Sequence, residues 1–100
     1  MEINEVSQDG TIMLSISGEI DGTNVDEFEN RVSDAADRTS SLVLDLGNLE
    51  YVSSAGLRVF LTLQKKVKQR GDSVIIKNVN EEVRDIFSVT GFVKLLNIEE

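Results

Sequence analysis

The chain has 100 residues, 40% of them apolar and 28% charged, a composition typical of a folded domain that buries a hydrophobic core. Because it contains neither cysteine nor histidine, disulfides, thiolate metal sites and the commonest general base are excluded, and we expect no metal or cofactor. The net charge of −8 disfavours nucleic acid as a partner, and no apolar run approaches the roughly 18 residues that a membrane span needs.

The chain begins with a pattern typical of a β-hairpin. MEINEVSQDG is acidic and has no apolar export signal, so we expect a cytoplasmic protein whose residues 2–7 form the first strand. Residues 8–10 supply turn-forming side chains, and the alternation of apolar residues in 11–17 predicts the second strand. Residues 18–22, GEIDG, are expected to form a loop between two glycines.

A first helix is predicted to begin near Thr23 or Asn24, because both are good N-cap residues. Acidic residues follow in its first turn, where the helix dipole favours negative charge. Its apolar residues recur at helical spacing and should face the core: Val25, Phe28, Val32, and Ala35 or Ala36.

The second half of the chain continues the alternation of strands and helices. A buried strand is predicted over 41–46, followed by a loop (47–53) and a long helix (54–70). The next strand covers 73–78, and the next helix covers 79–89 with Asn80 as its N-cap. Residues 92–98 are expected to form a helical turn and then a short edge strand. The pattern predicts one α/β domain over residues 1–100, in which helices pack on a mixed sheet of four to five strands.

The most informative stretch is DLGNLEYVSSAGLRVFL, residues 45–61. Ser53 and Ser54 stand where a buried strand and a loop lead into a helix, and helix N-termini favour oxygen atoms and anions. Either serine could simply cap the helix. Since no base lies nearby to activate a nucleophilic serine, an enzyme is the least expected function.

Neighbouring residues suggest that a macromolecule reaches this helix start. Ala55 and Gly56 are small and should leave the approach open. The apolar positions of the helix span a wider arc than one buried face requires, so part of that surface is expected to contact a partner unless the helix is buried on both sides. The predicted partner-binding residues are Asp21, Ser53, Ser54, Gly56, Leu57, Val59 and Phe60.

Together these motifs resemble the STAS-domain anti-sigma factor antagonist family. The resemblance covers essentially the whole chain: GEID at Gly18 to Asp21 and KNVNEEVRDIFSVTGFVKLLNI at Lys77 to Ile98 accompany the serine-bearing segment, in order and at the family's spacing. It implies a cytoplasmic bacterial switch that, when unphosphorylated, binds an anti-sigma factor and so frees a sigma factor.

The resemblance also implies how the switch is set. The anti-sigma factor would be a serine-protein kinase of the histidine-kinase-like ATPase type, and a metal-dependent, PP2C-type phosphatase would reverse its action. The family's phosphoacceptor is the second residue of Asp-Ser-Ser-Gly, and that position falls on Ser54. Here Ser53 replaces the preceding acid and Ala55 replaces the following serine, which leaves Ser53 as an alternative acceptor.

Two other functions remain open from the sequence. The chain could be a constitutive STAS adaptor in a multiprotein assembly, without control by phosphorylation. It could also bind a nucleotide or another anion at the Ser54 helix terminus, although it lacks a G-x-x-x-x-G-K-[ST] phosphate loop.

Overall fold

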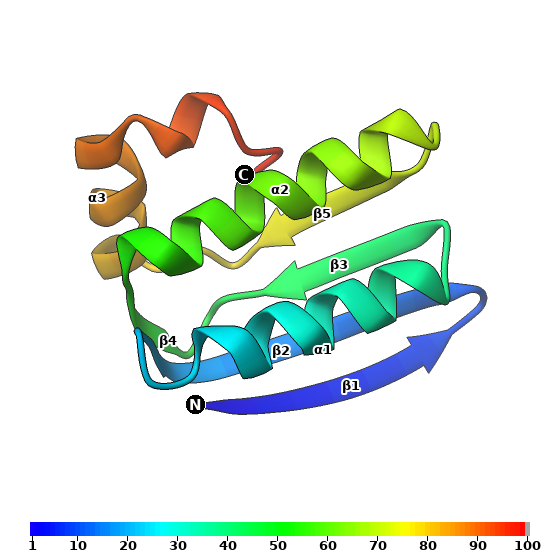
Figure 1. The fold of residues 1–100 in the computed structure, drawn as a ribbon, viewed down its shortest axis with the longest axis horizontal. Coiled ribbons are helices and arrows are strands. Elements are labelled where there is room, and N and C mark those ends of the chain that lie inside the picture. Colours follow the sequence, from blue (N-terminus) through cyan, green and yellow to red (C-terminus); the bar gives the residue numbers. More distant parts are fainter. Residues whose placement is uncertain (100) are drawn as a thin grey trace.

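The computed structural model describes residues 1–99, in which strands and helices alternate along the chain (Figure 1). In chain order they are β1 (Glu2–Gln8), β2 (Thr11–Ile20), α1 (Val25–Asp37), β3 (Ser41–Asp45), β4 (Leu49–Val52), α2 (Ser54–Gln69), β5 (Ser73–Lys77), α3 (Glu81–Thr90) and the 3₁₀ helix η1 (Phe92–Lys94).

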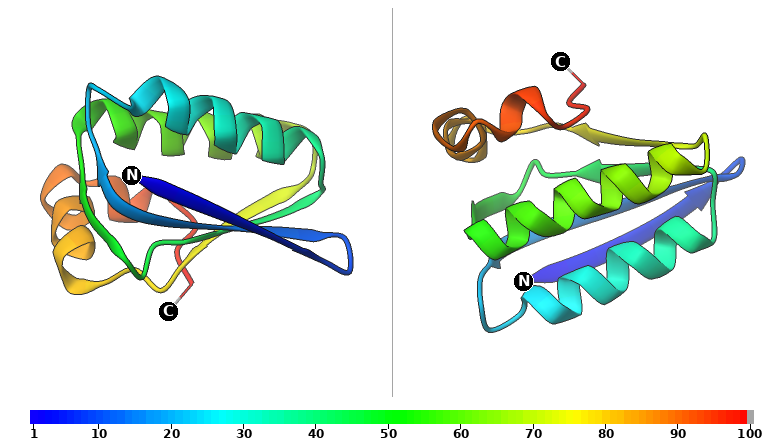
Figure 2. Two further views of the ribbon diagram at one scale, coloured as in Figure 1. Left: turned by 90° about the horizontal axis from the view of Figure 1, so that it is seen from below. Right: turned by 45° about the horizontal axis from the view of Figure 1, so that its top comes forward.

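The strands form a mixed sheet in the order β1-β2-β3-β5, and β4 pairs with the end of β2. The β1–β2 hairpin is antiparallel and every other pairing is parallel, as expected when helices connect successive strands. Figure 2 shows α1 and α2 side by side over one face of the sheet. The predicted α/β domain with a mixed sheet of up to five strands is confirmed.

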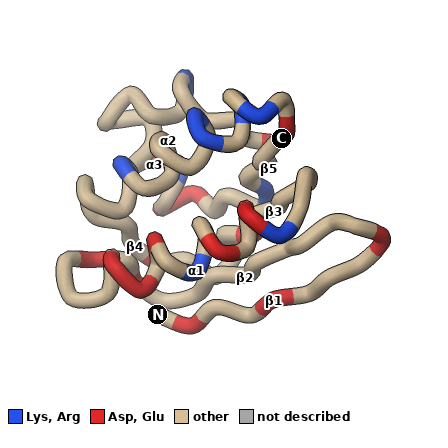
Figure 3. The backbone as a smooth tube through the Cα atoms, turned by 45° about the vertical axis from the view of Figure 1, so that its right-hand side comes forward, with Lys and Arg blue, Asp and Glu red and all other residues tan. Residues whose placement is uncertain are grey.

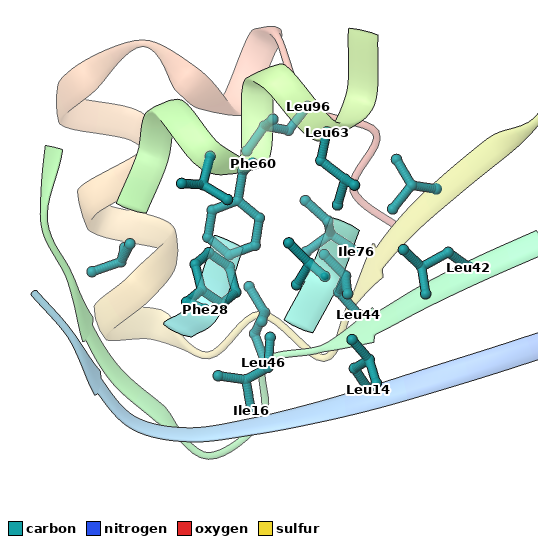
Figure 4. Packing of buried hydrophobic residues seen from close by; sticks show 14 of the residues in the cluster. Leu14, Ile16, Phe28, Leu42, Leu44, Leu46, Phe60, Leu63, Ile76 and Leu96 are labelled. Carbon is teal, nitrogen blue, oxygen red and sulfur yellow. The ribbon is translucent and has the colours of Figure 1, made fainter. Parts of the chain in front are cut away.

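The core lies between the two long helices and the inner face of the sheet (Figure 4). Three aromatic rings from α1, α2 and α3 meet there: the ring centroid of Phe60 lies 5.2 Å from that of Phe28 and 6.0 Å from that of Phe87. The residues of α1 that were expected to face the core are all buried or packed against it, which confirms the predicted buried face of this helix.

Two segments expected to be loops are strands. Residues 18–20 extend β2, and residues 49–52 form β4, which pairs with that extension across a register shift between Gly18 and Glu19. Leu49 and Val52 are buried while the two residues between them are exposed, so β4 lacks the alternating pattern by which strands are recognised. The remaining elements match, including Asn80 as the N-cap of α3 and a helical turn before an edge bridge at Ile98.

Candidate functional site

The candidate site is the junction between β4 and α2. The Ser53 backbone N–H donates to the carbonyl of Ile20 (2.8 Å), which ties the junction to the end of β2. The Ser53 hydroxyl accepts from the Gly56 N–H (3.3 Å), so Ser53 is the N-cap of α2. Ser53 is half-buried and its oxygen has a structural role.

Ser54, the first residue of α2, is exposed. Within residues 1–99 its hydroxyl has no hydrogen-bond partner, so the oxygen is accessible to another molecule. Arg58 lies one helical turn further on and is also exposed, and the described part of the chain gives its guanidinium no ion pair. Residues four apart face the same side of a helix, so Ser54 and Arg58 share one exposed face of α2.

The loop that carries Asp21 borders the same junction, because Asp21 follows Ile20 directly. The Asp21 carboxylate accepts from the backbone N–H (2.9 Å) and the hydroxyl (2.6 Å) of Thr23. These bonds, the hydroxyl first, hold the pKa of Asp21 below its ordinary value. Asn24 closes the turn: its side chain accepts from the Asp21 N–H and donates to the carbonyl of Glu19. Asp21 therefore shapes the loop and stays ionised.

The structure separates the seven predicted partner-binding residues into two groups. Asp21, Ser53 and Ser54 lie at the surface of one corner of the molecule, partly or fully exposed. The other four are buried in this fold, as expected for a helix that is covered on both sides: they are Gly56, Leu57, Val59 and Phe60. The wide apolar arc of α2 is buried because α1, β4 and β5 pack around this helix, and Phe87 of α3 contacts the ring of Phe60.

Gly56 has a different role from the one expected. A Cβ built on it would lie 2.6 Å from Cγ2 of Val52 and 2.9 Å from Cγ2 of Ile20. The glycine therefore lets α2 approach the ends of β2 and β4 closely, and it does not open a path to the serine. Close packing here fixes the position of the helix N-terminus.

Sequence reasoning missed Tyr51 on β4, a residue that is 45% exposed. It is the only tyrosine in the chain and lies three residues before Ser54. Exposed tyrosines are enriched at protein interfaces, where they supply contact area together with a hydroxyl. Tyr51 could have been found by recognising β4 as a strand, because the two ends of β4 are buried and its middle residues face outward.

Charge is unevenly distributed around the fold. Figure 3 shows acids along β1 and α1 and bases on α2. Asp37 of α1 pairs with Lys66 of α2 (2.9 Å) and with Arg70, the C-cap of α2 (3.7 Å). The basic stretch near the end of α2 thus partly serves to hold the two helices together. No group of three or more acids within residues 1–99 is arranged to hold a metal ion.

Known proteins resemble this chain over nearly its whole length. The family model of the STAS domain matches residues 2–100. The anti-sigma-B factor antagonist of Bacillus subtilis is 31% identical over 100 residues, which cover 98% of this chain and 92% of that protein. BtrV of Bordetella bronchiseptica, a candidate anti-sigma factor antagonist, is 31% identical over 91 residues, covering 90% of this chain and 78% of BtrV.

Solved structures agree on the fold. SpoIIAA, an anti-sigma factor antagonist of Bacillus, superposes with a TM-score of 0.79 in its unphosphorylated form, at 17% identity, over 99% of this chain and 89% of SpoIIAA. Its phosphorylated form gives a TM-score of 0.74 at 16% identity, over 99% and 92% of the two chains.

Among the described residues, no helix combines the length and apolarity needed to cross a membrane. Antagonists act by binding, which assigns this chain to binding proteins rather than enzymes. The match of the family model and the identity to full-length relatives lead to one assignment: the chain belongs to the STAS domain family, and anti-sigma factor antagonists are among its relatives.

Proposed function

We propose that this protein is an anti-sigma factor antagonist whose binding to its partner is switched off by phosphorylation of Ser54. The observation that carries the proposal is the exposed Ser54 hydroxyl at the first position of α2, which has no hydrogen-bond partner within residues 1–99. Support comes from the relatives, which are named as antagonists of anti-sigma factors, and from SpoIIAA, which exists in unphosphorylated and phosphorylated forms.

The physical effect of the modification follows from its position. A phosphoserine adds about −1.5 to −2 charges and three acceptor oxygens at the N-terminus of a helix. The helix dipole tolerates this charge, so the domain stays folded. A partner that covers Ser54 would have to desolvate the phosphate, and a loss of about 1.4 kcal/mol already weakens binding tenfold.

The structure favours Ser54 over Ser53 as the acceptor. The Ser53 oxygen already caps α2, and phosphorylating it would replace that bond and crowd a half-buried position. The Ser54 hydroxyl makes no such bond in the described part of the chain, and Arg58 stands at the i+4 position, where it can neutralise part of the added charge.

The partner surface that fits this proposal consists of the exposed residues around Ser54. Tyr51, Thr23 and Arg58 belong to three segments that border the β4–α2 junction, and all three are exposed. The buried residues of α2 contribute indirectly, because they fix the helix start against the ends of β2 and β4. The partner would be an anti-sigma factor that is also a serine kinase. A PP2C-type phosphatase would remove the phosphate again, and both enzymes would act in the cytoplasm.

The first test is to purify the protein from its own host, measure its intact mass, and map any phosphate by fragmentation. Phosphate on Ser54 is the expected result. Phosphate on Ser53 alone would keep the switch and overturn the assignment of the acceptor. If no phosphate is found under any growth condition with the cognate phosphatase deleted, the constitutive adaptor becomes the better explanation.

A second test measures the partner directly, with tagged variants expressed in the same host. Ser54→Asp should reduce capture of an ATPase-type kinase at least tenfold, because the carboxylate supplies charge at the proposed contact. Ser88→Asp is the matched control, since it adds the same charge at an exposed position of α3. Equal capture by both variants would contradict the switch.

A further inference from the structure

Arg58 carries a positive charge for which the described residues provide no ion pair. Its side chain is exposed. The residues three and four positions away on α2, with which a helical side chain interacts, are Ser54, Ala55, Leu61 and Thr62. None of these four is acidic, and the sequence of α2 contains no acid at all. In the unmodified chain, therefore, no charge pair within α2 involves Arg58.

The helix dipole accounts for the other bases of α2 but not for Arg58. Lys65, Lys66 and Lys68 lie in the last two turns of the helix, where the dipole favours cations. Arg58 begins the second turn, next to the end where the dipole favours anions and disfavours cations. The position of Arg58 therefore indicates a function other than stabilising the unmodified helix.

The two segments that form the β4–α2 junction are otherwise acidic. In residues 18–26 and 47–58, Arg58 is the single base. The same segments contain four acids: Glu19, Asp21, Asp26 and Glu50. The hydrogen bonds from Thr23 keep the Asp21 carboxylate ionised. A phosphate on Ser54 would add to this negative charge, and Arg58 is the cation of these segments that lies on the same helix face as Ser54.

Ser54 and Arg58 have the spacing and the order that favour an ion pair on a helix. Side chains at i and i+4 start about 5–6 Å apart, and the arrangement with the anion on the N-terminal side is the more favourable one. A guanidinium presents a planar fork of N–H donors that matches the oxygens of a phosphate. The residue four positions after Ser53 is Leu57, which is buried and apolar, so Ser53 has no equivalent partner.

We infer that Arg58 is a positioning residue for the phosphorylated state: its guanidinium pairs with the phosphate of Ser54 and holds it against the first turn of α2. The inference rests on the proposed function, because it concerns the regulation of the same serine. The pair orders the phosphate on the exposed face of the helix. Phosphorylation thus takes a cation away from the partner surface as well as adding an anion to it.

The test uses the full chain with phosphoserine placed at position 54 during synthesis, and follows the phosphate by ³¹P NMR over a range of pH. A cation beside the phosphate favours the dianion and so lowers its second pKa, which is about 6 in an ordinary phosphoserine. Arg58→Gln should raise this pKa, which corresponds to a decrease of about twofold in the acid dissociation constant. Arg58→Lys keeps the charge and should retain most of the lowering. Because Arg58 is exposed, both variants leave the packed core intact.

Lys65→Gln is the matched control, since it also removes an exposed positive charge from α2. Lys65 lies roughly three turns, or 16 Å, from Ser54 along the helix, beyond the screening length of about 10 Å in 0.1 M salt. This variant should leave the pKa of the phosphate unchanged. Equal pKa values in wild type and Arg58→Gln, or an equal change in Lys65→Gln, would overturn the inference.

A second spectroscopic signal reports on the guanidinium itself. The Arg58 Nε–H resonance in ¹⁵N–¹H NMR should shift between the unmodified and the phosphorylated chain, and an unchanged resonance would contradict the pairing. Because the phosphoserine is introduced during synthesis, these measurements do not depend on the kinase of the host. Absence of phosphate on Ser54 in the host would contradict the proposed function alone, whereas a phosphate insensitive to Arg58 would contradict this inference and leave the switch standing.

Discussion

At the scale of single residues, Gly56 couples the packing of the core to the position of the candidate site. Gly56→Ala should destabilise the domain by about 1–3 kcal/mol, because the new methyl group would overlap Val52 and Ile20 by an amount that ordinary contacts do not allow. The better helix propensity of alanine offsets up to about 1 kcal/mol of this cost. Urea denaturation of the variant measures the difference.

Gly22→Ala is the control for that measurement. Gly22 has no neighbouring atom within 4 Å of an added Cβ, and its substitution should change the free energy of unfolding by less than about 0.5 kcal/mol. If Gly56→Ala were as stable as Gly22→Ala, the close approach of α2 to the strand ends would not require glycine.

Single residues also show which features of the candidate site can be predicted from the sequence. A capping serine at the start of α2 could be predicted from residue type and helix position, but which of Ser53 and Ser54 forms the cap was settled only by the structure. The burial of Leu57, Val59 and Phe60 could not be predicted, because it depends on α1 and the strands β4 and β5 packing on different sides of α2, which no local pattern reveals.

At the scale of elements, Asn80 joins α3 to the segment that leads into the site. Its Oδ1 accepts from the Val83 N–H and caps α3, while its Nδ2 donates to the carbonyl of Leu49 in β4 (2.6 Å). Asn80→Ala loses both functions and should lower the free energy of unfolding by about 2–3 kcal/mol. Asn80→Ser keeps a cap and loses the link to β4, so about 1 kcal/mol of that loss should be recovered.

Thermal and urea unfolding of the two Asn80 variants separate the cap from the link. If Asn80→Ser were as stable as the wild type, the hydrogen bond from the Asn80 side chain to β4 would contribute nothing to stability.

The strand β4 itself was missed from the sequence because it is four residues long and buries its two ends rather than alternate residues. Long elements with a regular period, such as α2, were predicted to within a residue.

At the scale of the whole molecule, the fold brings the acidic first half of the chain into contact with a few arginines and lysines. Arg38, the C-cap of α1, pairs with Glu5 of β1 (2.7 Å), and Lys66 of α2 pairs with Asp37 of α1 (2.9 Å). These pairs join β1 to α1 and α1 to α2, so they connect elements that the core also connects. They are exposed, and each contributes little by itself.

The direction of the pKa shifts predicts how stability depends on pH. The hydrogen bond from Arg38 is the first cause that holds the pKa of Glu5 below its ordinary value of 4.5, and Lys66 lowers the pKa of Asp37 from 3.8 in the same way. Because these pKa values are lower in the folded state, the unfolded chain binds more protons in acid. The stabilisation is therefore present above the unfolded pKa and is lost as the pH falls through the folded pKa.

Glu5→Gln tests this dependence in urea denaturation between about pH 7 and pH 2. The variant should be less stable than the wild type at neutral pH, and the two should converge in acid, where Glu5 is protonated and the ion pair is lost. Glu2→Gln is the matched control, because Glu2 is an exposed acid of the same strand that makes no ion pair within residues 1–99. A constant difference between Glu5→Gln and wild type at every pH would mean that the side chain stabilises β1 by packing rather than by its charge.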